Sequence, residues 1–299
     1  MGTNAALVIQ IEAARFATDE KPESFPMRIF ASLAAVAALV LSVPAAADPA
    51  LDAVLASSHR DADRVRDQYR HPAETLAFFD VRPGMTVVDF WPAGGWFTRV
   101  LVPYLGPQGT YVGLNPLVED GDSPYLQALR NYADSLPAQA QDWVPQGGAR
   151  VLGANVGSIP EGLHGTADRV LIFREIHNMR RLGWFHDVAV AARNLLKPDG
   201  LLGIEQQRAH ADAPASYILG DNGYQREGDV IALFEAYGFE LVARSEINAN
   251  PRDPANWPQG VWTLPPGYRG TQATDTARRA ELDAIGESDR MTLLFRKRP

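Results

Sequence analysis

The chain has 299 residues, of which 46% are hydrophobic and 21% are charged, enough apolar material for one sizeable globular core. Its formal net charge is −8 and no basic stripe runs along it, which argues against a nucleic-acid partner. It contains no cysteine, so disulfides, thiolate metal sites and cysteine nucleophiles are excluded.

The N-terminal segment has the parts of a secretory signal peptide. Met27 and Arg28 precede the apolar run 29–43, and small residues ending at Ala47 precede Asp48. We expect cleavage between Ala47 and Asp48, export to the bacterial periplasm, and no stable membrane partner afterwards. We also expect translation to start at Met27. The alternative for the apolar run is an uncleaved membrane anchor.

We expect residues 48–299 to form a single domain that begins with helices over residues 48–80. Residues 60–67 carry charges of alternating sign, which we interpret as a solvated face. Pro72–Phe79 is predicted to be a helix, because proline suits a first helical turn and apolar residues follow on one side.

A strand, a glycine turn and a helix are predicted in succession over residues 86–104. Thr86–Phe90 is rich in β-branched residues, as expected of a buried strand. Gly94 and Gly95 permit a tight turn, and apolar residues recur at helical spacing from Trp96. This order is the first half of a βαβ unit, in which backbone N–H groups at the helix start face a ligand.

Further strands and helices alternate along the rest of the chain. Helices are expected at 125–143, with a break at Pro137, and at 184–196 and 229–237. Residues 248–276 form a long loop insertion whose tryptophans argue for packing. The six further strands are predicted at Thr110–Leu114, Arg150–Ala154, Ala167–Phe173, Leu201–Ile204, Glu240–Ile247 and Met291–Phe295.

This order predicts an α/β fold, a Rossmann-like, seven-stranded, mostly parallel sheet with helices on both faces. We expect the last strand to pair antiparallel at or near the edge of the sheet. The polar segment 287–290, directly before that strand, is expected to form an internal ion pair that fixes the edge.

The order acid, turn, glycines and helix resembles the cofactor loop of class I S-adenosylmethionine-dependent methyltransferases. In that family an acid ends the first strand and a Gly-x-Gly-x-Gly loop follows. Asp89 matches the acid and Gly95 the last glycine, while Trp91 and Ala93 stand at the other two positions. Together with the segments 174–178 and 287–291 behind a signal peptide, the loop resembles a group of exported bacterial proteins classed as predicted methyltransferases.

The resemblance implies a site for S-adenosyl-L-methionine at Asp89, Trp91, Gly94, Gly95, Asn115 and Asn155. Asn115 and Asn155 stand where the family carries acids at the second and third strand ends, and Glu119 or Asp120 could substitute for Asn115. We expect Gly95→Val to abolish ligand binding and to leave the fold intact. The structural alternatives are that Asp89 caps the following turn, the glycines form a simple tight turn, and Trp91 is a packing residue.

His177 and Glu175 follow the fourth predicted strand, at the edge where open α/β sheets place ligands. His177 is the best acid–base candidate because its free pKa lies near neutrality, and Glu175 precedes it by two residues. The alternative for His177 is a helix-capping or loop histidine. His177 and His186 lack a third ligand at suitable spacing, so no metal site is expected. The acceptor region implied by the resemblance contains Asp221, Tyr224 and Arg226.

The sequence leaves two functional hypotheses open. The first is a methyltransferase that uses S-adenosylmethionine on an unknown acceptor, a small molecule or otherwise, in the periplasm. The second is a non-catalytic periplasmic protein that binds a small molecule on the same scaffold.

Overall fold

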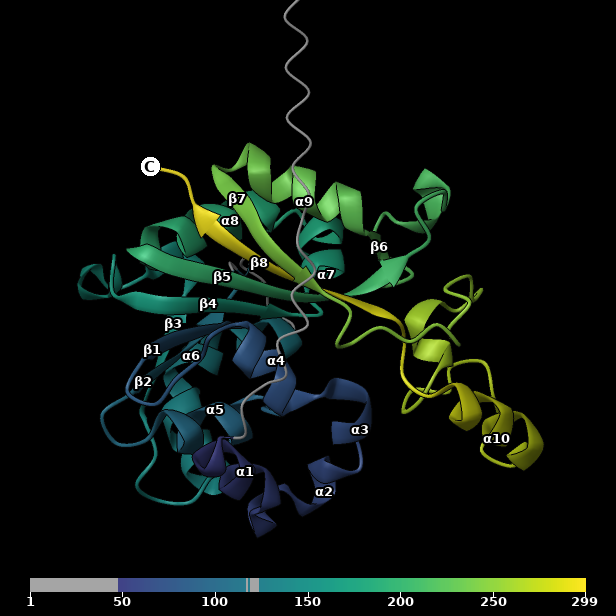
Figure 1. Cartoon of the computed structure of the whole chain (residues 1–299), viewed down its shortest axis with the longest axis horizontal. Helices are drawn as coiled ribbons and strands as arrows, with labels where there is room; N and C mark the ends of the chain where they lie inside the picture. The colour runs from purple at the N-terminus through teal and green to yellow at the C-terminus, as the bar shows by residue number, and fades with distance from the viewer. Residues whose placement is uncertain (1–47, 117, 119–123) are drawn as a thin grey trace, which may run out of the picture. The chain divides into compact units, whose positions relative to one another are not determined.

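The computed structural model describes residues 48–116, 118 and 124–299, so the predicted signal segment and the acids at positions 119 and 120 lie outside the described residues (Figure 1). The helices are α1 (Pro49–Ala56), α2 (Asp61–Arg64), α3 (Asp67–Arg70), α4 (Pro72–Phe78), α5 (Thr98–Leu105), α6 (Pro124–Trp143), α7 (Ile176–Arg181), α8 (Phe185–Leu195), α9 (Glu227–Ala236) and α10 (Thr276–Ile285). The strands are β1 (Thr86–Phe90), β2 (Thr110–Asn115), β3 (Arg150–Asn155), β4 (Ala167–Phe173), β5 (Leu196–Ala209), β6 (Gln225–Arg226), β7 (Phe239–Ser245) and β8 (Arg290–Lys297).

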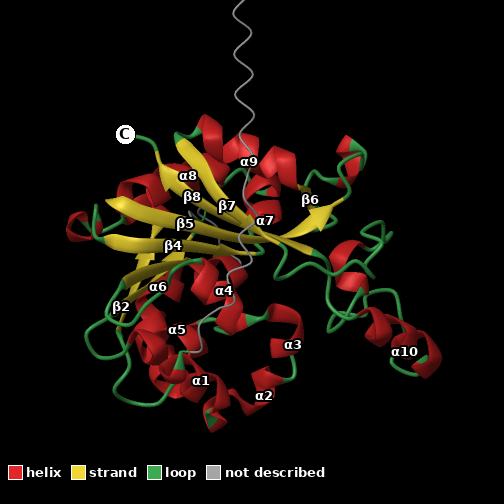
Figure 2. Cartoon of the chain, viewed as in Figure 1, coloured by secondary structure: helices red, strands yellow, loops and turns green. Residues whose placement is uncertain are grey.

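The strands form one sheet in the order β3-β2-β1-β4-β5-β8-β7, and the short β6 pairs with the end of β5 (Figure 2). Strands β1 to β5 are parallel, whereas β8 is antiparallel to both β5 and β7. The predicted Rossmann-like α/β fold is therefore confirmed, with the last strand beside the edge strand β7. The sheet has eight strands because β6, which is two residues long, carries no sequence signal of its own.

Helices cover both faces of the sheet and enclose two separate cores (Figure 1). Side chains alternate between the two faces along each strand. In β1, Val88 and Phe90 join the core under α8 and α9, whereas Val87 joins the core with α4, α5 and α6. Asp89 therefore lies on the same face as Val87, toward the N-terminal helices.

The strand order reverses between β1 and β4, since the chain runs outward to β2 and β3 and then returns to the other side of β1. At such a point the connections after the two neighbouring strands lead in opposite directions. Open α/β sheets bind ligands there, outside the carboxyl ends of the strands. The residues that follow β1 and β4 are therefore the first place to look for a site.

Two local predictions are wrong. Pro137 lies inside α6 and does not break it, because Leu136 is fully buried on the sheet and tertiary packing holds the helix together. Strand β5 does not end at Ile204, because its residues up to Gln207 pair with β8. Glu205 lies opposite Thr292 in this register, inside the sheet instead of in a loop after it.

The predicted solvated face at residues 60–67 is also partly wrong. Arg60 is fully buried and makes two hydrogen bonds to the carboxylate of Asp67, at 3.0 and 2.8 Å. Arg66 pairs with Glu287 at 2.5 Å, although the two residues lie 221 positions apart. Because Glu287 lies far away in the sequence, a charge pattern read locally cannot show that Arg66 has a buried partner. The ion pairs of Glu287 confirm the internal role predicted for the segment 287–290.

The insertion at residues 248–276 packs against the end of β5, as its tryptophans predicted. Asp253 is buried and accepts hydrogen bonds from the Tyr224 hydroxyl at 2.8 Å and from the Trp257 indole at 2.9 Å. A helix that the sequence reading missed, α10, follows the insertion. Within the described part of the chain, no helix is both long and apolar enough to span a membrane.

Candidate functional site

The turn after β1 has a strained backbone. Trp91 and Ala93 have φ values of 48° and 47°, in the left-handed region that non-glycine residues rarely adopt, at a cost of about 1–3 kcal/mol each. The N–H of Trp91 donates a hydrogen bond to the Leu114 carbonyl at 2.8 Å. Its ring packs edge-on against that of Trp184, with 5.2 Å between the ring centroids. The protein keeps this conformation without glycines at the two positions, which indicates that the shape of the turn matters.

The two glycines of this turn have different surroundings. A Cβ atom added to Gly94 would meet no atom within 4 Å, so the backbone there is open to an approaching ligand. Gly95 has φ of +73°, and a Cβ atom there would come within 2.5 Å of the Trp143 ring. The expectation that Gly95→Val leaves the fold intact is therefore wrong. Gly94 is instead the position at which the approach of a ligand to the turn backbone can be tested.

Asp89 is the penultimate residue of β1, and its carboxyl group is buried. The Tyr111 hydroxyl donates a hydrogen bond to its Oδ2 at 2.9 Å, and the Thr98 hydroxyl lies 2.8 Å from that of Tyr111. Burial raises the pKa of Asp89 to about 7, although the hydrogen bond from Tyr111 and the charge of Arg174 oppose the rise. The carboxyl group therefore changes charge near neutral pH.

Arg174 and Glu175 follow β4 directly, across the reversal point from Asp89. Arg174 has φ of 62°, another left-handed non-glycine residue, and its N–H donates to the Glu205 carbonyl at 2.6 Å. Burial raises the pKa of Glu175 to about 7 and the charge of Asp89 adds to the rise, against a hydrogen bond from Asn178 at 2.7 Å. The structure thus places two titratable carboxyl groups, Asp89 and Glu175, at neighbouring strand ends.

His177 lies in the first turn of α7 and is only 4% exposed. Burial lowers the pKa of its imidazole to about 4, and the charge of Arg181 adds to this, so the ring is neutral at pH 7. The ring lies edge-on to Trp262, at 5.8 Å between centroids, and its Nδ1 has no hydrogen-bond partner. Of the two predicted catalytic residues, Glu175 is the better matched to proton transfer near neutral pH.

Asn115 and Asn155 end the neighbouring strands β2 and β3 and contact one another. Asn115 Nδ2 donates to Asn155 Oδ1 at 3.1 Å and to the Leu129 carbonyl at 2.7 Å. Asn115 is fully buried, yet its Oδ1 has no hydrogen-bond partner. An unsatisfied buried acceptor is costly, which makes this atom a candidate for contact with a ligand donor.

The predicted acceptor residues Asp221, Tyr224 and Arg226 have different partners and different exposure. Tyr224 is buried and bonded to Asp253, and Arg226 pairs with Asp229 in α9 at 3.0 Å. Asp221 is highly exposed. Among the described residues, no group of three His, Cys, Asp or Glu side chains could hold a metal ion.

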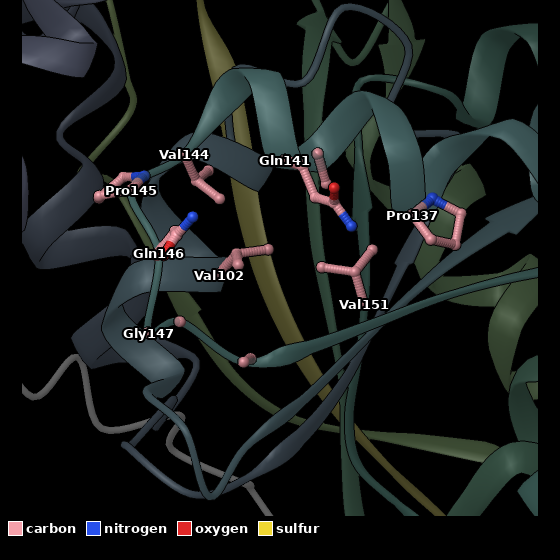
Figure 3. A pocket seen from close by; sticks show the side chains of 11 residues that line it. Val102, Pro137, Gln141, Val144, Pro145, Gln146, Gly147 and Val151 are labelled. Atoms are coloured by element: carbon pink, nitrogen blue, oxygen red, sulfur yellow. The ribbon is translucent and has the colours of Figure 1, made fainter.

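We call Asp89, Asn115, Glu175 and His177, at the carboxyl ends of the strands, the strand-end site. Two pockets lie elsewhere on the protein. One, of about 450 Å³, is lined by residues of α5, the C-terminal half of α6 and the start of β3, among them Val102, Gln141 and Val151 (Figure 3). It therefore opens at the amino end of the sheet. The other, of about 610 Å³, lies between α1, α4 and the Asp80–Pro83 turn. Neither pocket includes Asp89, Glu175 or His177.

The sequence did not predict Arg70 and Arg174 at the site, although an internal ion pair in the segment 287–290 was expected. Arg70, Arg174 and Arg290 are joined by ion pairs to Glu205 and Glu287, all of them buried or mostly buried. Arg174 could have been noticed, because it precedes Glu175 at the end of an apolar strand. Arg70 and Glu205 gave no local signal, since their partners come from distant parts of the chain.

No family model matches the sequence, and no curated protein matches it. Among solved structures, the chain is similar to a SAM-dependent methyltransferase from Aquifex aeolicus, with 16% identity and a TM-score of 0.44 over 64% of this chain and 94% of that one. It is also similar to geranyl diphosphate methyltransferase in complex with SAM, with 13% identity and a TM-score of 0.44 over 82% and 94% of the two chains. A third structure is the cyclase SpnF, with 15% identity and a TM-score of 0.46 over 77% and 81%. Similarities this weak carry no conclusion about the activity of this chain.

Proposed function

We propose that this protein is an S-adenosylmethionine-dependent methyltransferase that acts on an acceptor in the bacterial periplasm. The observation that supports this most is the convergence of polar groups at the reversal point of the sheet. Asp89, the penultimate residue of β1, and Glu175, just after the neighbouring strand β4, both have a pKa of about 7. Unsatisfied buried atoms of Asn115 and His177 lie at the same edge.

The residues present suit the cofactor at three points. Gly94 leaves room for a ligand against the turn backbone, and Asp89 is the penultimate residue of the strand that precedes the turn. Asn115 Oδ1 is free to accept a hydrogen bond from a donor such as a ribose hydroxyl. When bound, the cofactor would supply an activated methyl group on its sulfonium.

The protein's own part in the chemistry is to position the acceptor and take up a proton. A group with a pKa near the working pH serves best as a general base, and Glu175 meets this condition. The neutral imidazole of His177 can accept a hydrogen bond from the acceptor through Nδ1. We assign proton uptake to Glu175 and positioning to His177.

We also propose that the protein is exported and that its signal peptide is cleaved between Ala47 and Asp48. Asp48 is the N-cap of α1, where its carboxylate accepts hydrogen bonds from the N–H groups of Ala50 and Leu51. A cleavage at this bond leaves the cap of the first helix intact. N-terminal sequencing of protein recovered from the periplasm should begin at Asp48. Recovery of the full-length chain from the cytoplasm alone would contradict the proposal.

The second candidate, a non-catalytic binding protein, is favoured by one observation. Trp91 and Ala93 carry side chains at the two positions where the methyltransferase loop has glycines, and they hold strained backbone conformations to do so. The surface of the turn is therefore bulkier than a glycine loop. A protein that binds the cofactor and transfers no methyl group to any acceptor would fit this second candidate.

The test is a calorimetric titration with S-adenosylmethionine on three chains. Wild type should bind, Gly94→Val should bind at least tenfold more weakly, and Gly162→Val should bind like wild type. A Cβ atom at Gly94 or Gly162 meets no atom within 4 Å, so neither change should disturb the fold. Equal affinity in all three chains would show that the ligand does not pass the turn. Methyl transfer from a labelled cofactor to a periplasmic extract then separates an enzyme from a binding protein.

A further inference from the structure

Arginine side chains gather beside the strand-end site, on the face of the sheet that the N-terminal helices cover. Arg60 and Arg70 lie over the ring of Trp96, with guanidinium carbons 4.9 and 4.6 Å from its centroid. Arg66 and Arg70 both contact the carboxylate of Glu287, at 2.5 and 3.3 Å. We call Arg60, Arg66, Arg70, Arg174 and Arg290 the arginine cluster.

Two glutamates connect the cluster to the end of β4. Arg290 pairs with Glu287 and lies 3.4 Å from Glu205 Oε1. Arg174 Nη1 lies 3.4 Å from the same oxygen of Glu205. A continuous line of ion pairs therefore runs from the N-terminal helices to Arg174, at the reversal point of the sheet.

The cluster has more positive than negative charge. Its five guanidinium groups are paired with three carboxylates, those of Asp67, Glu205 and Glu287. Asp89 and Glu175 also lie near Arg174, but their pKa values of about 7 leave them only partly charged at neutral pH. Buried like charges repel one another strongly, so the cluster lacks a counter-charge.

Several buried donors in and beside the cluster have no hydrogen-bond partner. They are Nε of Arg60, Nε of Arg290 and the indole Nε1 of the neighbouring Trp96, and the three residues are 0%, 1% and 8% exposed. Arg290 Nε lies 3.4 Å from Glu205 Oε1 but makes no hydrogen bond to it. Arginine and tryptophan can only donate, so what these groups lack is a hydrogen-bond acceptor. Glu205, which pairs with the cluster, has one unsatisfied oxygen, Oε2, so three unsatisfied donors stand against one unsatisfied acceptor here.

Arg174 and Arg290 both lie 3.4 Å from the same oxygen of Glu205, so their guanidinium groups are close neighbours that share one carboxylate oxygen. Arg174 is the more accessible of the two, with 21% of its side chain exposed against 2% for Arg290. An anion arriving from solvent would meet Arg174 first.

We propose that Arg174 and Arg290 form a subsite for an anionic group, a carboxylate or a phosphate, carried by the methyl acceptor. The identification of the ligand as an acceptor rests on the proposed function. A guanidinium presents its donors in a fork that matches both kinds of anion, and a bound anion would supply the missing counter-charge. The acceptor would then be held with its anionic end at Arg174 and its reacting group beside Glu175.

The first test measures thermal unfolding of the chain with rising inorganic phosphate or citrate, at an ionic strength held constant with sodium chloride. The unfolding midpoint of wild type should rise with at least one of the two anions. The rise should be lost in Arg174→Gln, partly kept in Arg174→Lys, and unchanged in the control Arg296→Gln. Arg296 forms an exposed ion pair with Glu240, away from the cluster. No rise in wild type, or an equal rise in Arg174→Gln, would overturn the subsite.

The second test separates an acceptor from the cofactor's own carboxylate. S-adenosylmethionine and methylthioadenosine, which lacks the amino-acid part, are titrated into wild type and Arg174→Gln. Equal affinities in both chains support an acceptor subsite. A tenfold loss for S-adenosylmethionine alone would assign Arg174 to the cofactor and overturn the proposal. If phosphate stabilises wild type but S-adenosylmethionine does not bind, the proposed function fails while the anion subsite stands.

Discussion

The buried carboxyl group of Asp89 should make the stability of the fold depend on pH. Its pKa is about 7 in the folded protein against an ordinary value of 3.8. Below about pH 4 the group is protonated in both folded and unfolded states. As pH rises toward 7 the unfolded chain loses its proton first, so the folded state loses stability across this range. Three pKa units correspond to about 4 kcal/mol, which is the upper limit of the effect.

Asp89→Asn removes this charge while keeping nearly the same shape. At pH 8 the variant should have a free energy of unfolding up to about 4 kcal/mol higher than wild type, whereas at pH 4 the two should agree. The assay is urea denaturation at several pH values between 4 and 8. Asp221→Asn is the control, because the Asp221 side chain is 83% exposed. Parallel pH profiles for wild type and Asp89→Asn would refute the reasoning.

Three further predictions test the packing, the ion pairs and the chemistry. Gly153→Ala should cost about 3 kcal/mol of stability or more, because its Cβ would lie 1.8 Å from the Ala133 carbonyl oxygen, whereas Gly162→Ala should leave the melting temperature unchanged. Glu287→Gln should cost about 3–5 kcal/mol by denaturation, since it leaves buried arginines unpaired, and the exposed Glu240→Gln should cost less than about 1 kcal/mol. Once an acceptor is found, the methyl-transfer rate should fall below about pH 7 as Glu175 takes up a proton, and Glu175→Gln should be slow at every pH.

The sequence was sufficient to predict the framework of the sheet. Strands β1 and β4 begin and end where the apolar runs predicted, because a buried parallel strand needs a short run of apolar residues and little else. The polar residues at the ends of these runs, Asp89 inside the first and Glu175 after the second, were therefore identified as candidates. Their place at the reversal point follows from the strand order seen in the structure, whereas the alternation of strands and helices predicts only that the sheet is mostly parallel.

The surroundings of the site could not be predicted in the same way. Whether Arg66 is solvated or buried depends on Glu287, which lies 221 positions away, and nothing near Arg66 in the sequence indicates this partner. The effect of a change at Gly95 depends likewise on Trp143. The shift of the His177 pKa to about 4 comes from burial, which the identity of the residue does not reveal.

The arginine cluster has two parts that differ in how closely their charges are paired. This difference bears on why the cluster exists. Around Glu287, three arginines share one carboxylate and join the N-terminal helices to the start of β8. Buried ion pairs of this kind can often be replaced by apolar residues without loss of stability, so stability alone is a weak reason to keep them. Around Arg174 the contacts are longer and unsatisfied atoms remain. Arg174 also has a strained backbone and faces solvent at the reversal point. Strain and unsatisfied polar groups persist where function requires them, so the end of the cluster at Arg174 is the part we assign to a ligand.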